Sequence, residues 1–362
     1  MKRHKRYGRR TRSLPTDSDQ SNPLVNLWIW RILMPLGGQK ELIVNDGPLF
    51  CGFKEDAVAR SIGLEHWIDA EDGSDSVKDL RSELRKLYKL HSQKPVKARM
   101  PGYMEHNLKR LNKSVGLSKV DTRIFEFAVM INHNGLLDDA GDLLGDLSTM
   151  KMYRVLSTIL DIPEAEIRTS LSTRGMLKQS GLLSIEEGNN DLRRKLEVIS
   201  DKFCESLIAL DADPIDLLSD CVTPSSSATL KLQDYSHISE ELAVLKPYLK
   251  NAIKNKLKGV NIFIHGAPGT GKTQLAKVLA RHLRCQLFDI SGEDDEGEPV
   301  TGKNRLRAYR IAQYFFFKRR NLLLFDEMED VFSDDSSNSR STAQSHKAWI
   351  NRILEENPTP AV

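Results

Sequence analysis

The residues best suited to chemistry form the run Gly266-Ala267-Pro268-Gly269-Thr270-Gly271-Lys272-Thr273, which fits the pattern G-x-x-x-x-G-K-S/T. Its glycines let the backbone turn tightly enough to aim consecutive N–H groups at phosphate oxygens. Lys272 would bring a positive charge to the β- and γ-phosphates, and the Thr273 hydroxyl would bind Mg²⁺. A plain glycine-rich turn would need neither of these two residues. We therefore predict a nucleotide-phosphate loop made of Gly266, Ala267, Pro268, Gly269, Thr270, Gly271, Lys272, Thr273 and Gln274.

Two adjacent carboxylates follow this run at the end of the apolar segment Asn321–Phe325. A buried strand that ends in acids delivers them to the carboxyl edge of a sheet, where α/β proteins bind ligands. Asp326 would then help to hold Mg²⁺, and Glu327 would orient and polarise the attacking water. By itself the pattern also fits a strand that simply reaches solvent. Paired with the phosphate loop, it predicts Lys272 and Glu327 as catalytic residues and Thr273 and Asp326 as metal ligands.

The surrounding pattern predicts the elements that must position these residues. Short apolar runs at Val260–Ile264, Gln286–Ile290 and Leu322–Phe325 alternate with longer amphipathic stretches, which is typical of a parallel sheet covered on both faces. Residues 24–220 are instead mostly helical in pattern, for example over 77–90, 120–132 and 150–160. The Thr-Pro-Ser-rich residues 223–227 indicate a linker over 221–232. We expect an α-rich domain followed by an α/β domain.

Residues from about 232 to 362 resemble an AAA+ ATPase of the AAA clade. The resemblance is carried by GAPGTGKT (266–273) and LLLFDEMEDVF (322–332), which correspond to the Walker A and Walker B patterns, and loosely by Asp234–Ile238, where the family has its adenine-facing linker. It implies a P-loop NTPase fold over 233–362, the cofactors ATP and Mg²⁺, hydrolysis of ATP, and a hexamer-like homo-oligomer if the domain is complete.

The sequence departs from the family in two places. Pro299-Val300-Thr301-Gly302 lacks the aromatic residue that grips a threaded polypeptide, and it follows the acidic run Glu293–Glu298. After a helix over Ser345–Glu356 the sequence stops where the family's sensor strand begins, so the sensor, the arginine finger and the lid are missing. Arg340 and Arg352 lie too early to be that finger. The family pattern therefore predicts a truncated domain whose sheet lacks a central strand, which binds ATP weakly and does not turn it over appreciably.

Residues 150–199 have the order helix, turn, helix, hairpin, which resembles a winged helix-turn-helix. Its basic and polar side chains would then contact DNA. The alternative is a helical adaptor for a protein, with a solvated basic surface. The residues proposed to contact DNA are Thr173, Arg174, Lys178 and Gln179 in the recognition segment, and Arg193, Arg194 and Lys195 in the wing.

Composition sets further limits. The net charge is +3, but seven basic residues lie within the first twelve, so subtracting them leaves −4 for the remainder. A basic, polar tail over 1–22 and a mixed body do not fit a protein that coats nucleic acid.

The four cysteines form no paired motif, and the apolar segment Leu24–Leu36 is too short and too polar to span a bilayer. We expect a cytoplasmic protein without a membrane partner, and the histidines show no metal-ligand spacing.

Two classes of function fit these residues. The first is an ATPase that couples ATP binding and hydrolysis to the remodelling of a protein or nucleoprotein target, which the N-terminal domain would recognise. The second is a switch that binds DNA or protein and is gated by nucleotide without significant turnover. The sequence does not identify the target.

Overall fold

The computed structural model describes residues 22–44, 52–68, 76–92, 100–293, 300, 302–317, 319–328 and 342–362. The chain divides into a first unit (residues 1–105, 118–175 and 183–208) and a second unit (106–117, 176–182 and 209–362), each treated by itself below. Several sequence predictions concern residues outside the described ranges. These are the tail over 1–21, residues 294–299 of the acidic run, Thr301, residues 329–332 and Arg340.

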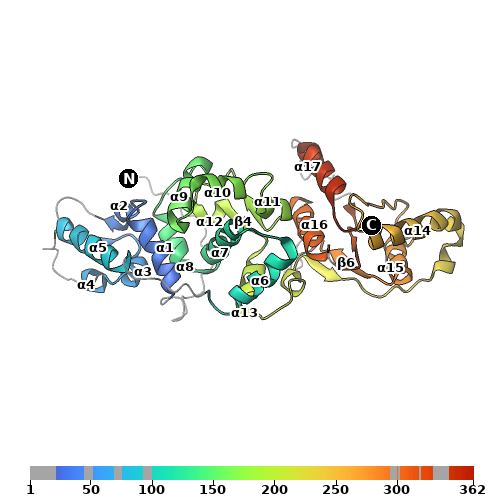
Figure 1. Cartoon of the computed structure of the whole chain (residues 1–362), viewed down its shortest axis with the longest axis horizontal. Coiled ribbons are helices and arrows are strands. Elements are labelled where there is room, and N and C mark those ends of the chain that lie inside the picture. Colours follow the sequence, from blue (N-terminus) through green and yellow to red (C-terminus); the bar gives the residue numbers. More distant parts are fainter. Residues whose placement is uncertain are drawn as a thin grey trace. The chain divides into compact units, whose positions relative to one another are not determined.

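The first unit is built almost entirely of helices (Figure 1). Two short antiparallel hairpins complete it, β1 (Ile43–Val44) with β2 (Gly52–Phe53) and β3 (Leu183–Ile185) with β4 (Leu196–Val198). Its helices are α1 (Pro23–Leu33), α2 (Gln39–Leu42), α3 (Asp56–Ser61), α4 (Glu65–Ile68), α5 (Val77–Ser92), α7 (Lys119–His133), α8 (Gly135–Asp142), α9 (Thr149–Leu160), α10 (Glu164–Ser170), α12 (Leu192–Lys195) and, except for its last residue, α13 (Asp201–Ala209). The predicted helices over 77–90, 120–132 and 150–160 are confirmed as α5, α7 and α9.

The apolar segment near the N-terminus is a core helix. In α1, the side chain of Asn22 caps the first turn and Pro23 starts the helix, a position where its missing N–H is no loss. Trp28 and Trp30 are both fully buried, and Trp28 packs edge-on against Phe127 of α7 at 5.2 Å between ring centroids. Among the described residues, no helix is both long enough and apolar enough to cross a membrane.

The second unit contains the sheet. Its helices are α6 (Met104–Val115, apart from the first two residues), α11 (Met176–Ser180), the 3₁₀ helices η2 (Asp216–Leu218) and η3 (Leu232–Ile238), α14 (Ser239–Asn255), α15 (Lys272–Leu283), α16 (Gly302–Phe316) and α17 (Thr342–Glu356). Strand β6 (Gln286–Ile290) pairs in parallel with β7 (Asn321–Leu324), as the apolar runs predicted. On its other side β6 pairs antiparallel with β5 (Val222–Pro224). Residues 222–224, predicted as part of a linker, are therefore an edge strand, because the backbone groups of β6 are free to pair there.

The last residues of the sequence complete this sheet, which corrects the prediction that a central strand is missing. Leu323 N donates to Pro360 O at 3.1 Å and Val362 N donates back to Leu323 O at 2.8 Å. On the opposite side Ile262 N donates to Ala361 O at 2.8 Å. Residues 360–362 thus lie between β7 and the segment 260–262, and both bridges are parallel. Short as it is, this segment joins the strand before the phosphate loop to the strand before Asp326.

The strand before the phosphate loop is more exposed than its apolar composition indicated. Ile262 and Ile264 are half-buried and pack against the core, but Phe263 is 77% exposed. Residues 260–262 pair with residues 360–362 alone among the described residues, so the other edge of this strand is open. The prediction of a strand buried on both faces is wrong here, because period-2 alternation turns Phe263 away from the face of Ile262 and Ile264, and its side chain lies largely in solvent.

Helices cover the two faces of the remaining sheet, and the strands alternate between them. Leu287, Leu322 and Leu324 belong to a core with α14 and α15. The intervening residues face α16: Phe288 stacks on Phe316 at 4.1 Å, and Phe325 meets Tyr309 edge-on at 5.8 Å. Figure 1 shows α16 on one side of the sheet and α15 on the other. By the same alternation, Asp326 returns to the side of α15.

A pH-dependent stability of the first unit follows from Glu126 in α7. Burial raises the pKa of this carboxyl from 4.5 to about 7, Arg123 opposes the rise, and Glu105 adds to it. Because the folded-state pKa is raised, the stabilisation is complete below about pH 4.5 and is lost as the pH rises through 7. Between about pH 4.5 and pH 7, we expect the free energy of unfolding in urea to fall by about 2–3 kcal/mol more for the parent than for Glu126→Gln. The exposed Glu166→Gln is the control, and identical pH profiles for parent and Glu126→Gln would contradict the prediction.

Candidate nucleotide-binding site

The phosphate loop has an exposed, glycine-dependent backbone. Gly269 and Gly271 adopt φ values of +80° and +83°, a region that side chains with a Cβ rarely occupy. Gly271 directly precedes α15, so the loop opens onto the first turn of a twelve-residue helix. That turn has backbone N–H groups without intrahelical partners and the positive end of the helix dipole. The loop and the helix together form a suitable site for an anion.

Lys272 folds back over the loop. Its Nζ donates to the carbonyl oxygens of Gly266 at 2.9 Å and Ala267 at 3.2 Å. These two contacts hold the ammonium group directly above the exposed backbone of the loop. Phosphate oxygens could replace the two carbonyls as acceptors and would add opposite charge. The position of Lys272 is therefore compatible with its predicted role.

Thr273 and Asp326 are brought together although they lie far apart in the sequence. The Thr273 hydroxyl donates to Asp326 Oδ2 at 2.6 Å, and both side chains are half-buried. A hydroxyl and a carboxylate are hard oxygen donors, which suit Mg²⁺. In the described parts of the chain, His, Cys, Asp and Glu form no group of three or more that could hold a metal ion. Mg²⁺ does not require one, since it takes one or two carboxylates together with phosphate and water oxygens.

Glu327 lies next to this pair in an unusual backbone conformation. Its φ is +51°, its side chain is exposed, and its N–H donates to Asp326 Oδ1 at 3.1 Å. Residues other than glycine adopt this left-handed region at an energetic penalty, which is why it often marks functional turns. Glu327 thus directly follows the metal-ligand candidate Asp326, and its exposed side chain is accessible to water.

A third carboxylate lies beside this edge of the sheet. Asp289 of β6 is opposite Leu324 in the strand register, and its Oδ1 is buried without a hydrogen-bond partner. Burial raises the pKa of Asp289, Ser225 and Lys277 oppose the rise, and Asp326 adds to it. Sequence reasoning overlooked Asp289, because one acid inside a short apolar strand gave no motif.

The segment predicted to face adenine supports the phosphate loop. Tyr235 in η3 is 3% exposed and its hydroxyl donates to the carbonyl of Gly271 at 2.9 Å. Burial, with a contribution from Asp234, raises the pKa of Tyr235, which keeps the donor proton in place. Gln274, predicted to bind nucleotide, uses its Oε1 to accept from the backbone and the hydroxyl of Thr229 at 2.9 and 3.0 Å. It ties the loop helix to the segment before η3.

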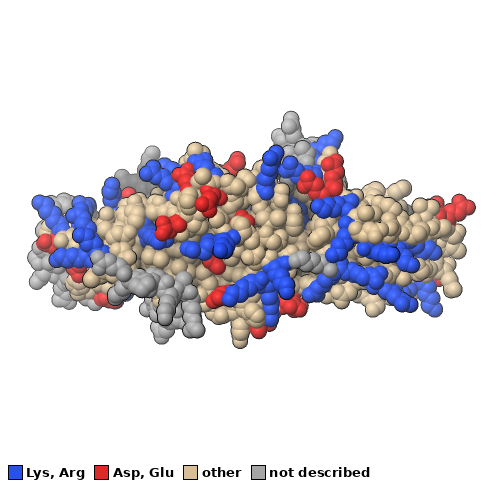
Figure 2. All heavy atoms as spheres, in the orientation of Figure 1, with Lys and Arg blue, Asp and Glu red and all other residues tan. Residues whose placement is uncertain are grey.

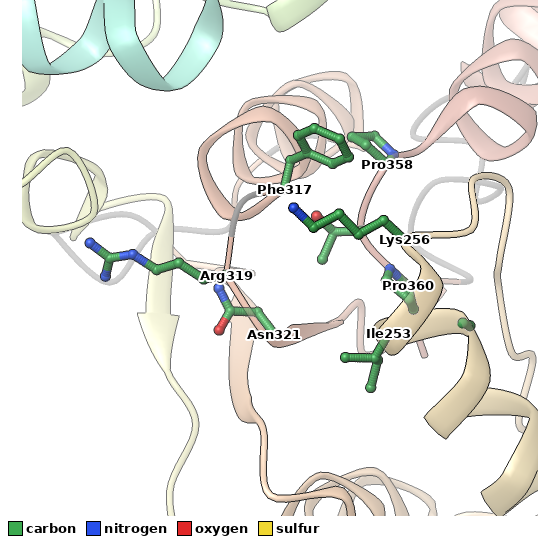
Figure 3. Close-up of a pocket in the computed structure, with 9 residues that line it drawn as sticks. Ile253, Lys256, Phe317, Arg319, Asn321, Pro358 and Pro360 are labelled. Carbon is green, nitrogen blue, oxygen red and sulfur yellow. The ribbon is translucent and has the colours of Figure 1, made fainter.

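A separate hollow lies at the start of β7, away from the phosphate loop. It is lined by the end of α14, by Phe317, Arg319 and Asn321, and by residues 358–360 (Figure 3). Lys256 reaches over the Phe317 ring at 5.3 Å, while Arg319 points away from the labelled neighbours. The space admits little more than a water molecule, which could satisfy the buried amide nitrogen of Asn321. We do not assign it to nucleotide.

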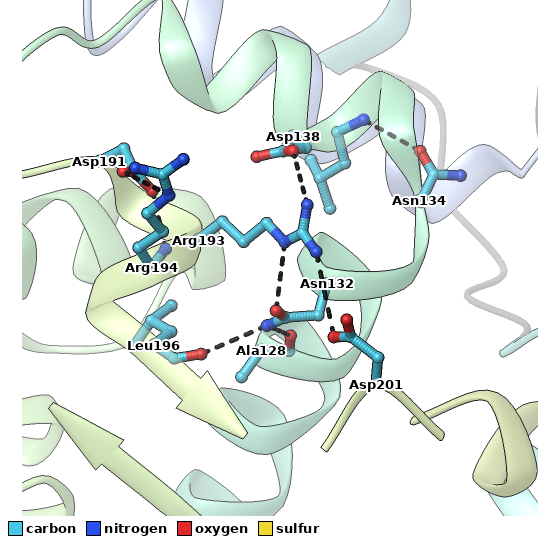
Figure 4. Close-up of polar contacts among 10 residues, drawn as sticks. Ala128, Asn132, Asn134, Asp138, Asp191, Arg193, Arg194, Leu196 and Asp201 are labelled. Atoms are coloured by element: carbon cyan, nitrogen blue, oxygen red, sulfur yellow. Dashed lines mark hydrogen bonds and ion pairs between the residues drawn. The ribbon is translucent and has the colours of Figure 1, made fainter. Parts of the chain in front are cut away.

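Two of the three basic residues predicted to form a DNA-binding wing are engaged or buried inside the first unit. Arg193 donates to Asp138 Oδ2 at 3.2 Å and to Asn132 Oδ1 at 3.3 Å (Figure 4). Lys195 is 1% exposed, and Arg194 pairs with Asp191 at 3.5 Å. Arg193 is thus engaged by a carboxylate of α8 and Lys195 is buried, whereas the side chain of Arg194 is 74% exposed.

The winged helix-turn-helix itself is not confirmed. The hairpin β3–β4 forms as predicted, but it belongs to the first unit. Residues 176–182, which contain the expected recognition residues Lys178 and Gln179, belong to the second unit. Thr173 and Arg174 are exposed. Figure 2 shows basic and acidic side chains interspersed on the face in view, not one continuous basic surface.

Comparison with known proteins identifies the family of the segment that carries the site. Residues 262–359 match the family described as "ATPase family associated with various cellular activities (AAA)". This segment is therefore an AAA domain, and it implies the α/β fold of P-loop NTPases, as the sequence motifs predicted. No solved structure matches the chain.

The similar proteins are named as an AAA domain-containing ATPase, an ATP-dependent metalloprotease and a proteasome regulatory subunit. The chain is 31% identical over 124 residues to the Drosophila melanogaster homolog of ATPase family AAA domain-containing protein 3A, covering 33% of this chain and 20% of that protein. It is 32% identical over 124 residues to the ATP-dependent zinc metalloprotease FtsH 2 of Phytoplasma mali, covering 32% and 17%. It is 28% identical over 95 residues to the 26S proteasome regulatory subunit 8 homolog of Schizosaccharomyces pombe, covering 26% and 23%. The chain thus spans about a fifth of the length of these relatives.

The contact between Tyr235 and the phosphate loop leads to a testable prediction. Tyr235→Phe keeps the buried ring but removes the hydrogen bond to the carbonyl of Gly271. The loss of one such bond, about 0.5–1.5 kcal/mol, should weaken ATP binding roughly 2- to 10-fold. Titration with a fluorescent ATP analogue measures this effect. Tyr248→Phe, at a position that is 46% exposed, is the matched control. Equal affinities for the two variants would show that the loop does not depend on the Tyr235 hydroxyl.

Proposed function

We propose that this chain binds ATP with Mg²⁺ and hydrolyses it, in place of the negligible turnover expected from a sheet without a central strand, since residues 360–362 occupy that position. The observation that carries the proposal is the 2.6 Å hydrogen bond between Thr273 and Asp326, which joins the helix after the phosphate loop to the end of β7. Two separate sequence patterns thereby meet at one edge of one sheet. The match of residues 262–359 to the AAA family supports the same chemistry.

In this proposal each side chain has one task. Lys272 and the loop N–H groups bind the β- and γ-phosphates, and Thr273 and Asp326 hold Mg²⁺ with its water molecules. When bound, the metal would neutralise charge on the phosphates. Glu327 holds the attacking water and accepts its proton. Gly266, Ala267, Pro268, Gly269, Thr270 and Gly271 shape the loop, whereas Gln274 acts through Thr229 and not on the nucleotide.

We further propose that hydrolysis remodels a protein target that the N-terminal helical region recognises, and that the chain acts as a hexamer-like homo-oligomer in the cytoplasm. Relatives named as an ATP-dependent protease and as a proteasome regulatory subunit favour a protein target. The internal use of Arg193 and Lys195 makes DNA the weaker candidate.

The first test concerns nucleotide binding. Lys272→Ala removes the ammonium group above the loop and should weaken ATP binding at least about 10-fold, because hydrogen bonds to charged groups contribute about 1.5–3 kcal/mol. Isothermal titration with ATP and Mg²⁺ measures the change. Lys277→Ala, on the same helix but bonded to the Ser226 hydroxyl, is the control. If both variants bind ATP equally well, the loop is not the phosphate site.

The second test concerns hydrolysis. Glu327→Gln keeps the shape of the side chain but removes its basicity, so ATP binding should persist while phosphate release falls about 10²- to 10⁴-fold. Glu356→Gln, on the exposed end of α17, is the control. Parental turnover in Glu327→Gln would exclude Glu327 as the catalytic base. A parent chain that binds a partner only with ATP, yet releases no phosphate, would indicate a nucleotide-gated switch instead.

A further inference from the structure

Arg305 is a buried arginine on the face of α16 that covers the sheet. It is 3% exposed, and no motif in the sequence singled it out. Its guanidinium lies 4.6 Å from the centroid of the Phe325 ring, the residue directly before Asp326. A buried arginine requires acceptors around it, since desolvation of its charge is unfavourable otherwise.

Two such acceptors are the backbone carbonyls of Asp326 and Glu327, which together form the acidic turn. Arg305 Nη2 donates to Asp326 O at 2.6 Å, and Nη1 donates to Glu327 O at 3.1 Å. The planar guanidinium presents its donors in a rigid fork, so binding both carbonyls restricts the orientation of both peptide groups. The two contacts therefore fix the backbone that carries the predicted metal ligand and the predicted catalytic base.

The acidic turn is held from both faces of the sheet. From the side of α15, the Thr273 hydroxyl binds the Asp326 side chain. From the side of α16, Arg305 binds the main chain, including the carbonyl of Glu327, whose φ of +51° needs external support. Loss of Arg305 would let this turn relax toward an ordinary backbone conformation and would redirect both carboxylates.

We propose that Arg305 is a positioning residue that sets the direction of the Asp326 and Glu327 carboxylates toward Mg²⁺ and the attacking water. The proposal rests on the proposed function, since it concerns the same nucleotide site. It assigns to this cation an indirect role, exerted through its contacts with the backbone of Asp326 and Glu327. It predicts a selective loss of metal-dependent steps, with binding by the phosphate loop intact.

The same helix offers a matched control. Arg307 is also buried, at 8% exposure, and its Nε donates to a backbone carbonyl, that of Gly181, at 2.8 Å. This carbonyl and that of Leu182, which Nη2 contacts at 3.5 Å, both lie outside the acidic turn. Arg307→Met and Arg305→Met therefore remove the same kind of side chain from the same element, and only the second should affect the metal site.

The experiment measures the affinity of the full chain for a slowly hydrolysed ATP analogue, with Mg²⁺ and with EDTA. The gain in affinity that Mg²⁺ brings should fall about tenfold in Arg305→Met, while the affinity in EDTA changes less than about twofold. Arg305→Lys retains one donor and should recover part of the gain. Arg307→Met should keep the parental gain. Thermal unfolding tests whether each variant is folded. If Arg305→Met is not, the comparison is made with Arg305→Lys.

Phosphate release provides a second readout, in which kcat falls about 10- to 100-fold in Arg305→Met with KM nearly unchanged. A parental Mg²⁺ gain in Arg305→Met, an equal loss in Arg307→Met, or no Mg²⁺ gain in the parent would each overturn the proposal. A parent that binds the Mg²⁺ complex without turnover would refute the proposed hydrolysis alone, because the binding measurement still decides the role of Arg305.

Discussion

The candidate site depends on the parallel pairing that residues 360–362 make with both of their neighbours. These residues hydrogen-bond to Leu323 and Phe325 on one side and to Val260 and Ile262 on the other. Parallel strands deliver their carboxyl ends to one edge of a sheet, so the phosphate loop and Asp326 emerge together. Without this short segment, nothing in the described sheet would link the strand before the loop to β7.

The helices on the two faces of the sheet contribute different parts of the candidate site. Helix α15 supplies Thr273 and, from the loop before it, the backbone that can bind phosphate. Helix α16 supplies Arg305, which holds the carbonyls of Asp326 and Glu327 from the opposite face. Tyr235 braces Gly271 from outside the sheet. The exposed loop is thus supported by buried contacts, and this combination lets a glycine-rich segment keep a defined conformation while remaining open to a ligand.

In the first unit, a charged side chain stabilises the packing of helices and does not support an exposed site. Arg193 is engaged by Asp138 and Asn132, and the largely buried helix α1 packs Trp28 against Phe127. Some basic residues of this unit thus contact its own helices, although the sequence pattern alone suggested a basic surface. A recognition surface on this unit would have to be built from other, exposed side chains, and a protein target fits that constraint better than a regular array of phosphates.

Local sequence patterns determined the helices of the first unit, the strands β6 and β7, and the two motifs of the site. These features depend on short-range periodicity and on residue types that only a phosphate loop requires, so they can be predicted without knowledge of the tertiary structure. Tertiary structure decided the rest. Residues 222–224 became a strand because β6 offered a free edge, and residues 360–362 filled the sheet because both neighbours lacked a partner. Arg193 donates to Asp138, 55 residues away, and Gln274 accepts from Thr229, 45 residues away. Arg305 acquired a role through two carbonyls more than 20 residues along the chain. Such pairings depend on which segments meet in space, and a linear sequence does not encode that in any local pattern.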